Sequence, residues 1–334
     1  MNKNIAIIGA GLAGGTLAQR LHQQGYTVTL FEKSRGVGGR LSSCRLPSGE
    51  ADLGAPTLTE LLSQHSPQNS AYTDWLVDQG SVEPWLASLS DFNDATHQEK
   101  YTETLLVHEQ KQSRLIRTLI KGCTLHTSTR IKHLVPEKQG CSLIDNQGKA
   151  LGSFSRVIVT APAPQAVELL NKVPQFSKIA AQIKTYPTWV SIICLETPTA
   201  IDTDIFCGSH PTFARIIRDT SKPNHQSGDN TEAWYLEANR DWSTAHQSAA
   251  IESVSAQLLS EFKLVVKKPI KHSFQRTHRW LYAGHGTVHS EPFLLCDKTG
   301  IGACGDWLGA TGLEGAWQSG DALANAILEA DSRG

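Results

Sequence analysis

The first 32 residues hold the feature that most constrains the fold of this chain. Residues 5–8, IAII, form a short apolar run rich in β-branched side chains, which is typical of a strand buried on both faces. Gly9, Gly11 and Gly14 follow at G-x-G-x-x-G spacing, and apolar residues four apart behind them indicate a helix that ends near Gly25. The pattern predicts a strand, a glycine-rich turn and a helix in immediate succession.

A second strand and an acidic residue complete the pattern. Residues 26–31 indicate a strand that ends at Glu32, which lies 21 residues after Gly11. In a βαβ dinucleotide-binding unit, an acid at this distance accepts a hydrogen bond from a ribose hydroxyl, and the glycines let a pyrophosphate approach the helix N-terminus. A lone glycine motif is a weak signal, but here the strand before it and the helix, the second strand and the acid after it all occur in order. We therefore predict dinucleotide contacts at Gly9, Gly11, Leu12, Ala13, Gly14, Glu32 and Lys33.

A second glycine cluster follows within eight residues of Glu32. Nicotinamide dehydrogenases usually need no glycine-rich stretch at this place. The segment GVGGRLSS, residues 36–43, resembles the second pyrophosphate-side motif of the two-dinucleotide-binding flavoproteins, the group of amine oxidases, desaturases and renalase. The resemblance implies that FAD is the cofactor and that Gly39 and Arg40 lie against it.

The resemblance continues along the chain. ADLGA at residues 51–55 is similar to a loop that lies beside the flavin in that group, and GDWLGATGLEGAW closes the pattern near the C-terminus. In the C-terminal stretch Asp306 matches the carboxylate that takes ribityl hydroxyls, and a helix is expected to start near Glu314. The cofactor residues that the resemblance adds are Gly54, Ala55, Pro56, Thr57, Ile131, Thr160, Asp306, Glu314, Gly315 and Ala316.

Several stretches are most similar to the bacterial renalase-like branch of these flavoproteins. They are FEKSRGVGGR, TAPAPQA, IIRDTSKP, WSTAH, HRWLYA and GDWLGATGLEGAW. The chain departs from that branch where the substrate should bind, because Pro56, Thr57 and Leu58 replace a glutamine and an aromatic residue, and Leu281 replaces an arginine. The substrate is therefore less well defined by the resemblance than the cofactor is.

We expect an α/β fold in which two domains interleave. A Rossmann-like FAD-binding domain of the two-dinucleotide type is expected at 1–60, 107–165 and 285–334, with a helix at 112–120 and a strand pair at 124–135 and 141–145. Residues 61–106 and 166–284 are expected to form a substrate domain around a mixed or antiparallel sheet, since runs such as TWVSIICLE and AWYLEAN alternate in polarity. The polar stretch at residues 221–232 predicts a surface loop.

The amino-acid composition limits which kinds of binding partner and which cellular compartment are expected. The chain has 334 residues, of which 40% are apolar and 19% charged, and a net charge of −1, so nothing favours nucleic acid or a membrane surface as a partner. Seven scattered cysteines without a C-x-x-C pair indicate reduced thiols in a cytoplasm rather than disulfides or zinc. We expect no bound metal and no membrane-spanning segment.

Catalytic side chains are the least defined part of the prediction. The flavin that the resemblance implies accepts a hydride itself, so no acid or base is obligatory. Trp280 and Tyr282 are candidates for a substrate pocket, although aromatic residues at alternate positions of a strand often belong to a core. His246 is a weaker candidate, and His285 and His289 are interpreted as surface or core histidines.

Three functions from different classes remain open. The resemblance favours an oxidase that transfers a hydride from the 2- or 6-dihydro isomers of NAD(P)H to non-covalent FAD and then reduces O2 to H2O2. The alternative within this class is an amine oxidase or another FAD-linked dehydrogenase of a small molecule. A second possibility is an NAD(P)-binding reductase, in which Lys33 and Arg35 would accept a 2′-phosphate. The third is a protein that binds FAD without turnover. Covalent attachment of the flavin is not expected, because residues 307–317 contain no Cys or His.

Overall fold

The chain folds into two compact units, each built from separate stretches of sequence. The computed structural model describes residues 3–47, 49–61, 70–93, 100–225 and 231–333. Unit 1 comprises Met1–Gly39, Ile116–Thr185 and Gly284–Gly334, and unit 2 comprises Arg40–Leu115 and Tyr186–Ala283.

The units interleave, but they change over at other residues than predicted. Residues 40–60 and 107–115 lie in unit 2, because Cys44, Ala51 and Leu53 are buried in a core of that unit. Residues 166–185 lie in unit 1, where Phe176 and Ala180 are buried in the core around the parallel sheet.

A six-stranded sheet forms the centre of unit 1. The apolar run at the N-terminus is its strand β1, which pairs in parallel with β2 on one side and β11 on the other. β18 extends the parallel part beyond β11, β7 extends it beyond β2, and β17 adds an antiparallel edge. The strands are β1 (Asn4–Ile8), β2 (Thr27–Phe31), β7 (Thr124–His126), β11 (Arg156–Val159), β17 (Phe293–Cys296) and β18 (Ile301–Cys304). This is the Rossmann-like sheet that the sequence predicted.

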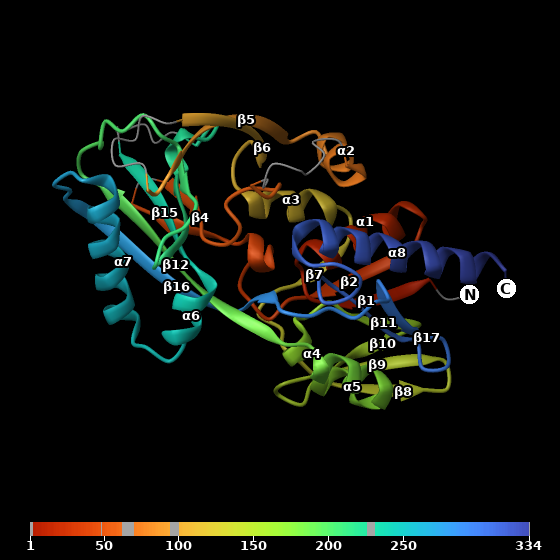
Figure 1. Cartoon of the computed structure of the whole chain (residues 1–334). Coiled ribbons are helices and arrows are strands. Elements are labelled where there is room, and N and C mark those ends of the chain that lie inside the picture. Colours follow the sequence, from red (N-terminus) through yellow and green to blue (C-terminus); the bar gives the residue numbers. More distant parts are fainter. Residues whose placement is uncertain (1–2, 48, 62–69, 94–99, 226–230, 334) are drawn as a thin grey trace. The chain divides into compact units, whose positions relative to one another are not determined.

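Two helices of unit 1 lie side by side, as Figure 1 shows. They are α1 (Leu12–Gln23), which follows the glycine turn, and the C-terminal α8 (Gly312–Ser332). Gly320 of α8 allows the close approach, since a Cβ atom there would lie 2.6 Å from the carbonyl oxygen of Ala13. Arg20 of α1 also pairs with Asp321 of α8 at 2.8 Å.

A smaller sheet and two helices complete unit 1. The sheet contains β8 (Ile131–Glu137), β9 (Gly140–Asp145) and β10 (Ala150–Phe154), and the helices are α4 (Ala163–Leu169) and α5 (Pro174–Gln182). The single strand expected at 124–135 is therefore wrong: β7 belongs to the parallel sheet and β8 to this one. Ser128, whose φ is +53°, lies in the turn that separates them.

Unit 2 is built on a seven-stranded mixed sheet. Its strand order is β16, β12, β15, β14, β13, β5, β6, and the β5–β13 pair is parallel while β12–β15, β13–β14, β14–β15 and β5–β6 are antiparallel. The strands are β5 (Val82–Asp91), β6 (Lys100–His108), β12 (Thr185–Leu195), β13 (Ile205–Cys207), β14 (Phe213–Arg218), β15 (Glu232–Ala238) and β16 (His272–His285). The two alternating runs noted in the sequence are β12 and β15, which pair directly.

Both faces of this sheet are covered. Trp189, Trp234 and Phe262 belong to a core on one face, where α6 (Arg240–Ala245) and α7 (Ile251–Val266) pack. Val190 and Tyr235 belong to a core on the other face, as neighbours in each strand point to opposite sides. That second core includes the hairpin of β3 (Ser43–Leu46) and β4 (Gly49–Asp52). The helix α2 (Ala71–Asp78) also belongs to unit 2, and the chain passes from unit 2 to unit 1 within α3 (Gln112–Leu119).

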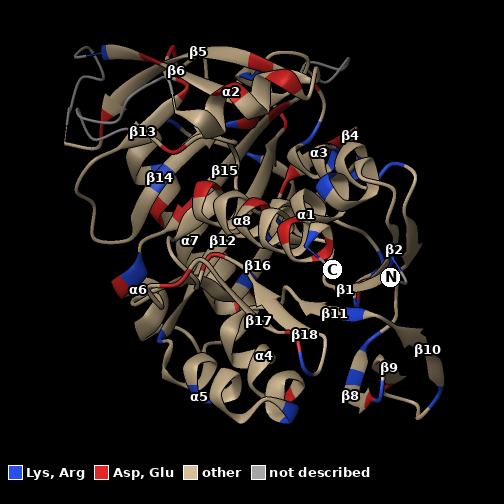
Figure 2. Ribbon diagram, turned by 90° about the vertical axis from the view of Figure 1, so that its right-hand side faces the viewer, with Lys and Arg blue, Asp and Glu red and all other residues tan. Residues whose placement is uncertain are grey.

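Charged side chains are mixed in sign over the ribbon. Figure 2 shows both signs on α6, which carries Arg240 and Asp241. Among the described helices, none is long and apolar enough to cross a membrane.

Candidate functional site

The predicted dinucleotide residues of unit 1 gather at one edge of the parallel sheet. β1, β2, β11 and β18 run in the same direction, and their carboxyl ends are followed by Gly9, Glu32, Thr160 and the Gly305–Asp306 pair respectively. In doubly wound sheets, ligands bind outside the carboxyl ends of the strands. Residues from four separate places in the sequence therefore come to the edge where a dinucleotide is expected.

The three glycines of the turn differ in what surrounds them. Gly9 has a φ of +117°, and a Cβ there would lie 2.5 Å from Oγ1 of Thr160. A Cβ at Gly14 would lie 2.3 Å from the carbonyl oxygen of Gly9, so this glycine lets α1 pack against the turn. A Cβ at Gly11 would meet no atom within 4 Å. The open space beside Gly11 is where a pyrophosphate would approach the backbone.

The second glycine cluster folds back onto the first. The N–H of Gly38 donates to the carbonyl of Ala10 at 2.8 Å, and a Cβ at Gly39, whose φ is +54°, would lie 3.4 Å from Cα of Gly11. The two clusters therefore form one glycine-walled turn before α1. No side chain caps the N-terminus of α1, where Leu12 and Ala13 lie in the first helical turn.

Glu32 holds this turn from the end of β2. Its Oε2 accepts a hydrogen bond from the N–H of Ala10 at 3.0 Å and its Oε1 one from the N–H of Ser34 at 2.8 Å, and the residue is buried. Lys33 is exposed, and its Nζ donates to Gln165 at 2.9 Å. Although Lys33 remains accessible to solvent, partial desolvation by the surrounding chain, followed by the nearby Arg130, lowers its pKa.

Asp306 has a histidine partner that the sequence did not suggest. Nε2 of His285 donates to Oδ1 of Asp306 at 3.2 Å, and both residues are buried. The other ring nitrogen, Nδ1, is buried and finds no hydrogen-bond partner among the described residues. The interpretation of His285 as a surface or core histidine missed this contact because its partner follows another strand.

The other predicted residues of unit 1 lie at element ends. α8 starts after Thr311 without a side-chain cap, and Gly315 allows the turn before it, since a Cβ there would lie 2.2 Å from the carbonyl oxygen of Ala310. Glu314 is exposed and Ala316 is buried in the first turns of this helix. Ile131 is the first residue of β8, and its side chain belongs to the unit-1 core.

In unit 2, the predicted residues Gly54, Ala55, Pro56 and Thr57 lie in one tightly bonded loop, which we call loop 53–57. The N–H groups of Leu53 and Gly54 donate to the carbonyl of Ser42, and the N–H of Ala55 donates to that of Arg40 at 2.7 Å. A Cβ at Gly54 would lie 1.9 Å from the same Arg40 oxygen, so only glycine fits there.

The carbonyl of Pro56 accepts from Nε2 of Gln112 at 3.0 Å, and buried Thr57 donates to the carbonyl of Thr59 at 2.7 Å. Nη1 of Arg40 donates to the carbonyl of Ala283 at 3.0 Å. Loop 53–57 is thus held at both of its ends.

Trp280 and Tyr282 lie two residues apart on β16, so their side chains share a face of the sheet. Nε1 of Trp280 donates to the carbonyl of Leu53 at 3.0 Å, and the ring packs against the core that contains Leu53. Trp280 is therefore half-buried against this core, and it also anchors loop 53–57.

His246 lies on the opposite face of the same sheet. Its carbonyl accepts from Nε1 of Trp189 at 3.1 Å, and its ring stacks on Trp242 at 3.9 Å between centroids. The structure does not bring His246 together with Trp280 and Tyr282, because it ends α6 on the face that carries Trp189.

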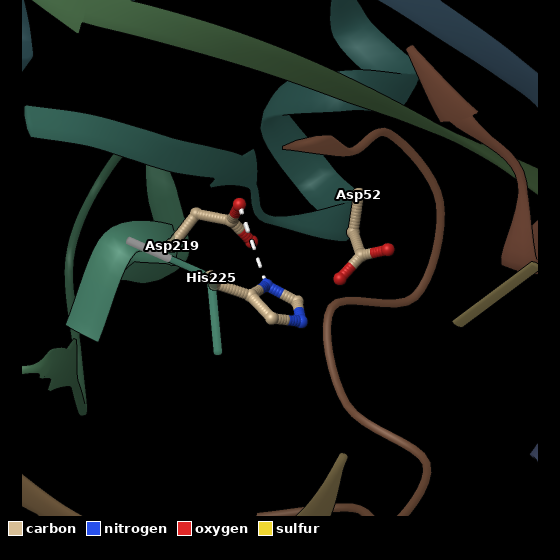
Figure 3. A group of neighbouring side chains, drawn as sticks. All are labelled: Asp52, Asp219 and His225. Carbon is tan, nitrogen blue, oxygen red and sulfur yellow. Dashed lines mark ion pairs between the residues drawn. The ribbon is translucent and has the colours of Figure 1, made fainter. Parts of the chain in front are cut away.

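A cluster of buried charges lies beside loop 53–57 in unit 2. Figure 3 shows Asp52, Asp219 and His225, whose oxygen and nitrogen atoms lie within 4.8 Å of one another, as in some metal sites. Two ammonium groups already neutralise these carboxylates, however. Nζ of Lys222 bonds Asp52 at 2.9 Å and Asp219 at 2.6 Å, and Nζ of Lys111 bonds Asp219 at 3.3 Å. A metal ion at this cluster would have to compete with these two ammonium groups.

The two carboxylates and the two ammonium groups of the cluster carry equal and opposite charge. Burial and the neighbouring charges act in opposite directions on the pKa of Asp219 and on that of Lys222. Burial alone would raise the pKa of Asp219, but the ammonium groups of Lys222 and Lys111 outweigh it and hold the pKa well below its usual range. Burial would lower the pKa of Lys222, but Asp219 and Asp52 raise it. A cavity of about 140 Å³ opens beside Lys111, Asp219 and His225.

The prediction of a surface loop at residues 221–232 holds only in part for the residues that the structure describes: residues 222–225 form a turn in which Asn224 is exposed, but several side chains of the segment do not lie at the surface. Lys222, His225 and Glu232 are all buried. The polar composition of the segment gave no signal of this, because the partners that justify burying Lys222 lie elsewhere, at Asp52 and in the turn at Asp219. Residues 226–230 lie outside the described residues.

Comparisons with known proteins agree with this geometry. Residues 7–71 match the family described as NAD(P)-binding Rossmann-like domain. A segment of 54 residues, 16% of this chain, is 44% identical to the 4,4'-diapophytoene desaturase (4,4'-diaponeurosporene-forming) of Staphylococcus aureus strain Newman, and it spans 11% of that protein.

Solved structures resemble nearly the whole chain, and two of them serve as examples. Cyclohexylamine oxidase from Brevibacterium oxydans IH-35A aligns with a TM-score of 0.74 at 10% identity, covering 98% of this chain and 99% of the other. An oxidoreductase from Methanosarcina mazei aligns with a TM-score of 0.71 at 11% identity, covering 96% and 99%. This chain shares their fold.

The residues at the sheet edge fit FAD on their own chemistry. FAD needs an approach for its pyrophosphate, an acceptor for the adenosine ribose and an acceptor for the ribityl hydroxyls. The open space beside Gly11 and the carboxylates of Glu32 and Asp306 supply groups of these kinds at the ends of parallel strands. The buried Nδ1 of His285 adds a polar atom that has no hydrogen-bond partner within the described chain.

Proposed function

We propose that this protein is an FAD-dependent oxidoreductase that holds FAD without a covalent bond. The observation that carries the proposal is the convergence of Gly9, Glu32, Thr160 and Asp306 at the carboxyl ends of four parallel strands, together with the second glycine cluster against Gly11. FAD, when bound, supplies the hydride acceptor.

The residues of the chain bind and orient the cofactor in this proposal. Glu32 and Asp306 accept from hydroxyl groups of FAD, and the N-termini of α1 and α8 place partial positive charge toward its anionic groups. Loop 53–57 and Arg40, in unit 2, also contact the cofactor, as the resemblance of ADLGA and GVGGR to the flavoproteins implies.

Acid precipitation of the purified protein tests the cofactor. We expect FAD in the supernatant, identified by chromatography against FAD, FMN and NAD(P) standards. Recovery of NAD(P) without flavin would instead support the reductase that exposed Lys33 and Arg35 could serve. Yellow pigment that stays in the washed pellet would contradict non-covalent binding.

For the substrate, we propose a renalase-like oxidation of the 2- or 6-dihydro isomers of NAD(P)H. A dihydropyridine can donate a hydride to the flavin without a protein base, which suits a chain whose candidate pocket residues, Trp280 and Tyr282, are aromatic. One dihydro isomer, one O2 and one proton then become NAD(P)+ and H2O2. Small amines are the alternative donors, since cyclohexylamine oxidase has the same fold.

Product formation separates these donors. The FAD-loaded protein is mixed in air with the 2- and 6-dihydro isomers, with ordinary 4-dihydro NAD(P)H and with primary amines, and H2O2 is measured. We expect equal amounts of NAD(P)+ and H2O2 from the isomers and slow reaction with the others. Fast H2O2 formation from an amine, with none from the isomers, would assign the protein to the amine oxidases.

A further inference from the structure

The charge cluster beside loop 53–57 has a structural link to that loop, and the link runs through Lys222. Nζ of Lys222, fully buried, bonds Oδ2 of Asp52, the residue that ends β4 and precedes the loop. Asp52 also accepts from Gln112 twice, from its N–H at 3.0 Å and from Nε2 at 3.3 Å. The same Nε2 donates to the carbonyl of Pro56 at 3.0 Å. A continuous chain of buried hydrogen bonds therefore connects the ammonium group to the far end of the loop.

The ion pairs of the cluster fix the positions of its side chains and leave no excess negative charge for a metal ion. Asp52 and Asp219 carry two negative charges, and Lys222 and Lys111 two positive ones, so an added cation would have to displace an ammonium group. Nδ1 of His225 accepts from Nζ of Lys111 at 2.9 Å, and Nε2 donates to the carbonyl of His108 at 3.3 Å, so both ring nitrogens are used.

We propose that Lys222 is a positioning residue, whose ammonium group fixes Asp52 and, through Gln112, holds loop 53–57 in the conformation that contacts the cofactor. The inference rests on the proposed function for the identity of the ligand. The hold on the loop itself follows from the contacts in unit 2, and it can be measured without any ligand.

Lys111 provides a matched control. Both lysines are buried and both bond Asp219, but only Lys222 bonds Asp52. The variants Lys222→Met and Lys111→Met each remove one buried ammonium group from the same cluster. A cluster that only stabilises the fold would make them behave alike.

The first experiment is hydrogen exchange on the protein freed of cofactor. We expect the amides of residues 53–55, which donate to Ser42 and Arg40, to exchange about ten times faster in Lys222→Met and within about twofold of the natural protein in Lys111→Met. Equal protection of these amides in the two variants would overturn the proposal, whether or not the protein binds FAD.

The second experiment measures FAD binding by titration of the cofactor-free variants. Loss of the charge-assisted bond predicts a dissociation constant raised about tenfold or more in Lys222→Met and little changed in Lys111→Met. Failure of the natural protein to bind FAD would reject the proposed function but not the exchange result.

A neutral variant guards against misfolding of Lys222→Met. Gln112→Met keeps the backbone N–H on Asp52, removes the side-chain links to Asp52 and Pro56 together with the acceptor of the His108 N–H, and leaves no charge unpaired. We expect it to fold and to raise the exchange of loop 53–57. Unchanged exchange of the loop amides in Gln112→Met would contradict the proposal.

Metal addition to the natural protein is a separate test. A rise in its unfolding temperature on adding Zn²⁺ or Mn²⁺ alone would favour a metal site and would also contradict the proposal.

Discussion

Gly11 and Gly14 stand three residues apart at the start of α1, the first as its N-cap residue and the second in its first turn, and the structure gives them different tasks. A Cβ at Gly14 would collide with the Gly9 carbonyl, while a Cβ at Gly11 would enter open space. We expect Gly14→Ala to lower the free energy of unfolding by about 1–3 kcal/mol, as overpacking does. Gly11→Ala should keep the stability to within about 1 kcal/mol, as expected at a helix N-cap, and yet weaken FAD binding.

Urea unfolding and FAD titration of the two variants check this difference. Because the two residues both lie at the start of α1, each variant serves as the control for the other. A Gly11→Ala protein that binds FAD as tightly as the natural one would contradict the placement of the pyrophosphate.

His285 makes a second prediction at the scale of single residues. Its Nε2 is the donor to buried Asp306, so His285→Leu leaves a buried carboxylate without that partner. We expect a loss of about 1–3 kcal/mol in the free energy of unfolding and weaker FAD binding. His285→Gln, which can place an amide N–H near the position of Nε2, should recover most of both, as measured by urea unfolding and FAD titration. Equal losses in the two variants would show that the hydrogen bond to Asp306 does not matter.

At the scale of elements, the contact between α1 and α8 depends on Gly320. We expect Gly320→Ala to destabilise unit 1 by about 1–3 kcal/mol, because its Cβ would lie too close to the Ala13 carbonyl. Gly36→Ala is the control, since a Cβ at Gly36 would meet nothing within 4 Å and should change stability by less than about 0.5 kcal/mol. Urea unfolding measures both, and equal stability of the two variants would contradict tight packing of these helices.

The elements that the sequence predicted well are those with a strong local pattern. The apolar run of β1, the helix after the glycines and the acid after β2 are each determined by nearby residues, and all three occur where they were expected. The strand expected at 124–135 failed because the chain crosses between two sheets at Ser128, and pairing between distant strands leaves no local signal.

The residues of the candidate site also divide into those with a local sequence signal and those that depend on distant partners. Glu32 and Asp306 could be named from motifs, but His285, Lys111 and Lys222 could not, because each is explained by a partner that lies far along the chain. A buried lysine in a polar segment is indistinguishable from an exposed one until its carboxylate partners are placed around it.

At the scale of the whole molecule, the charge cluster should determine how stability depends on pH. Since the pKa of Asp219 is depressed, its contribution to stability is present above about pH 4, the unfolded value, and is lost as the pH falls through the folded pKa. The pKa of Lys222 is raised, so its pH dependence is opposite to that of Asp219. Its contribution to the free energy of unfolding is present below about pH 10.4 and is lost as the pH rises through the folded pKa. The contribution of the cluster to the free energy of unfolding should therefore stay nearly constant between about pH 5 and 9.

Lys222→Met should change this dependence. With one ammonium group gone, two carboxylates share a buried site and their pKa rises, so the variant gains stability as the pH falls. We expect a loss of about 3–5 kcal/mol at pH 8 that becomes smaller at pH 5, measured by urea unfolding at both values. A loss that is the same at both values would contradict the ion-paired state of the cluster.

The central claim is that this chain transfers a hydride from a small donor to bound FAD. Anaerobic titration of the FAD-loaded protein with the 2- or 6-dihydro isomers of NAD(P)H tests it most directly, with the visible spectrum as the readout. We predict that the flavin colour bleaches with one donor per flavin and returns when oxygen is admitted. A protein that binds no FAD, or that stays yellow with these isomers and with every amine tried, would contradict the account.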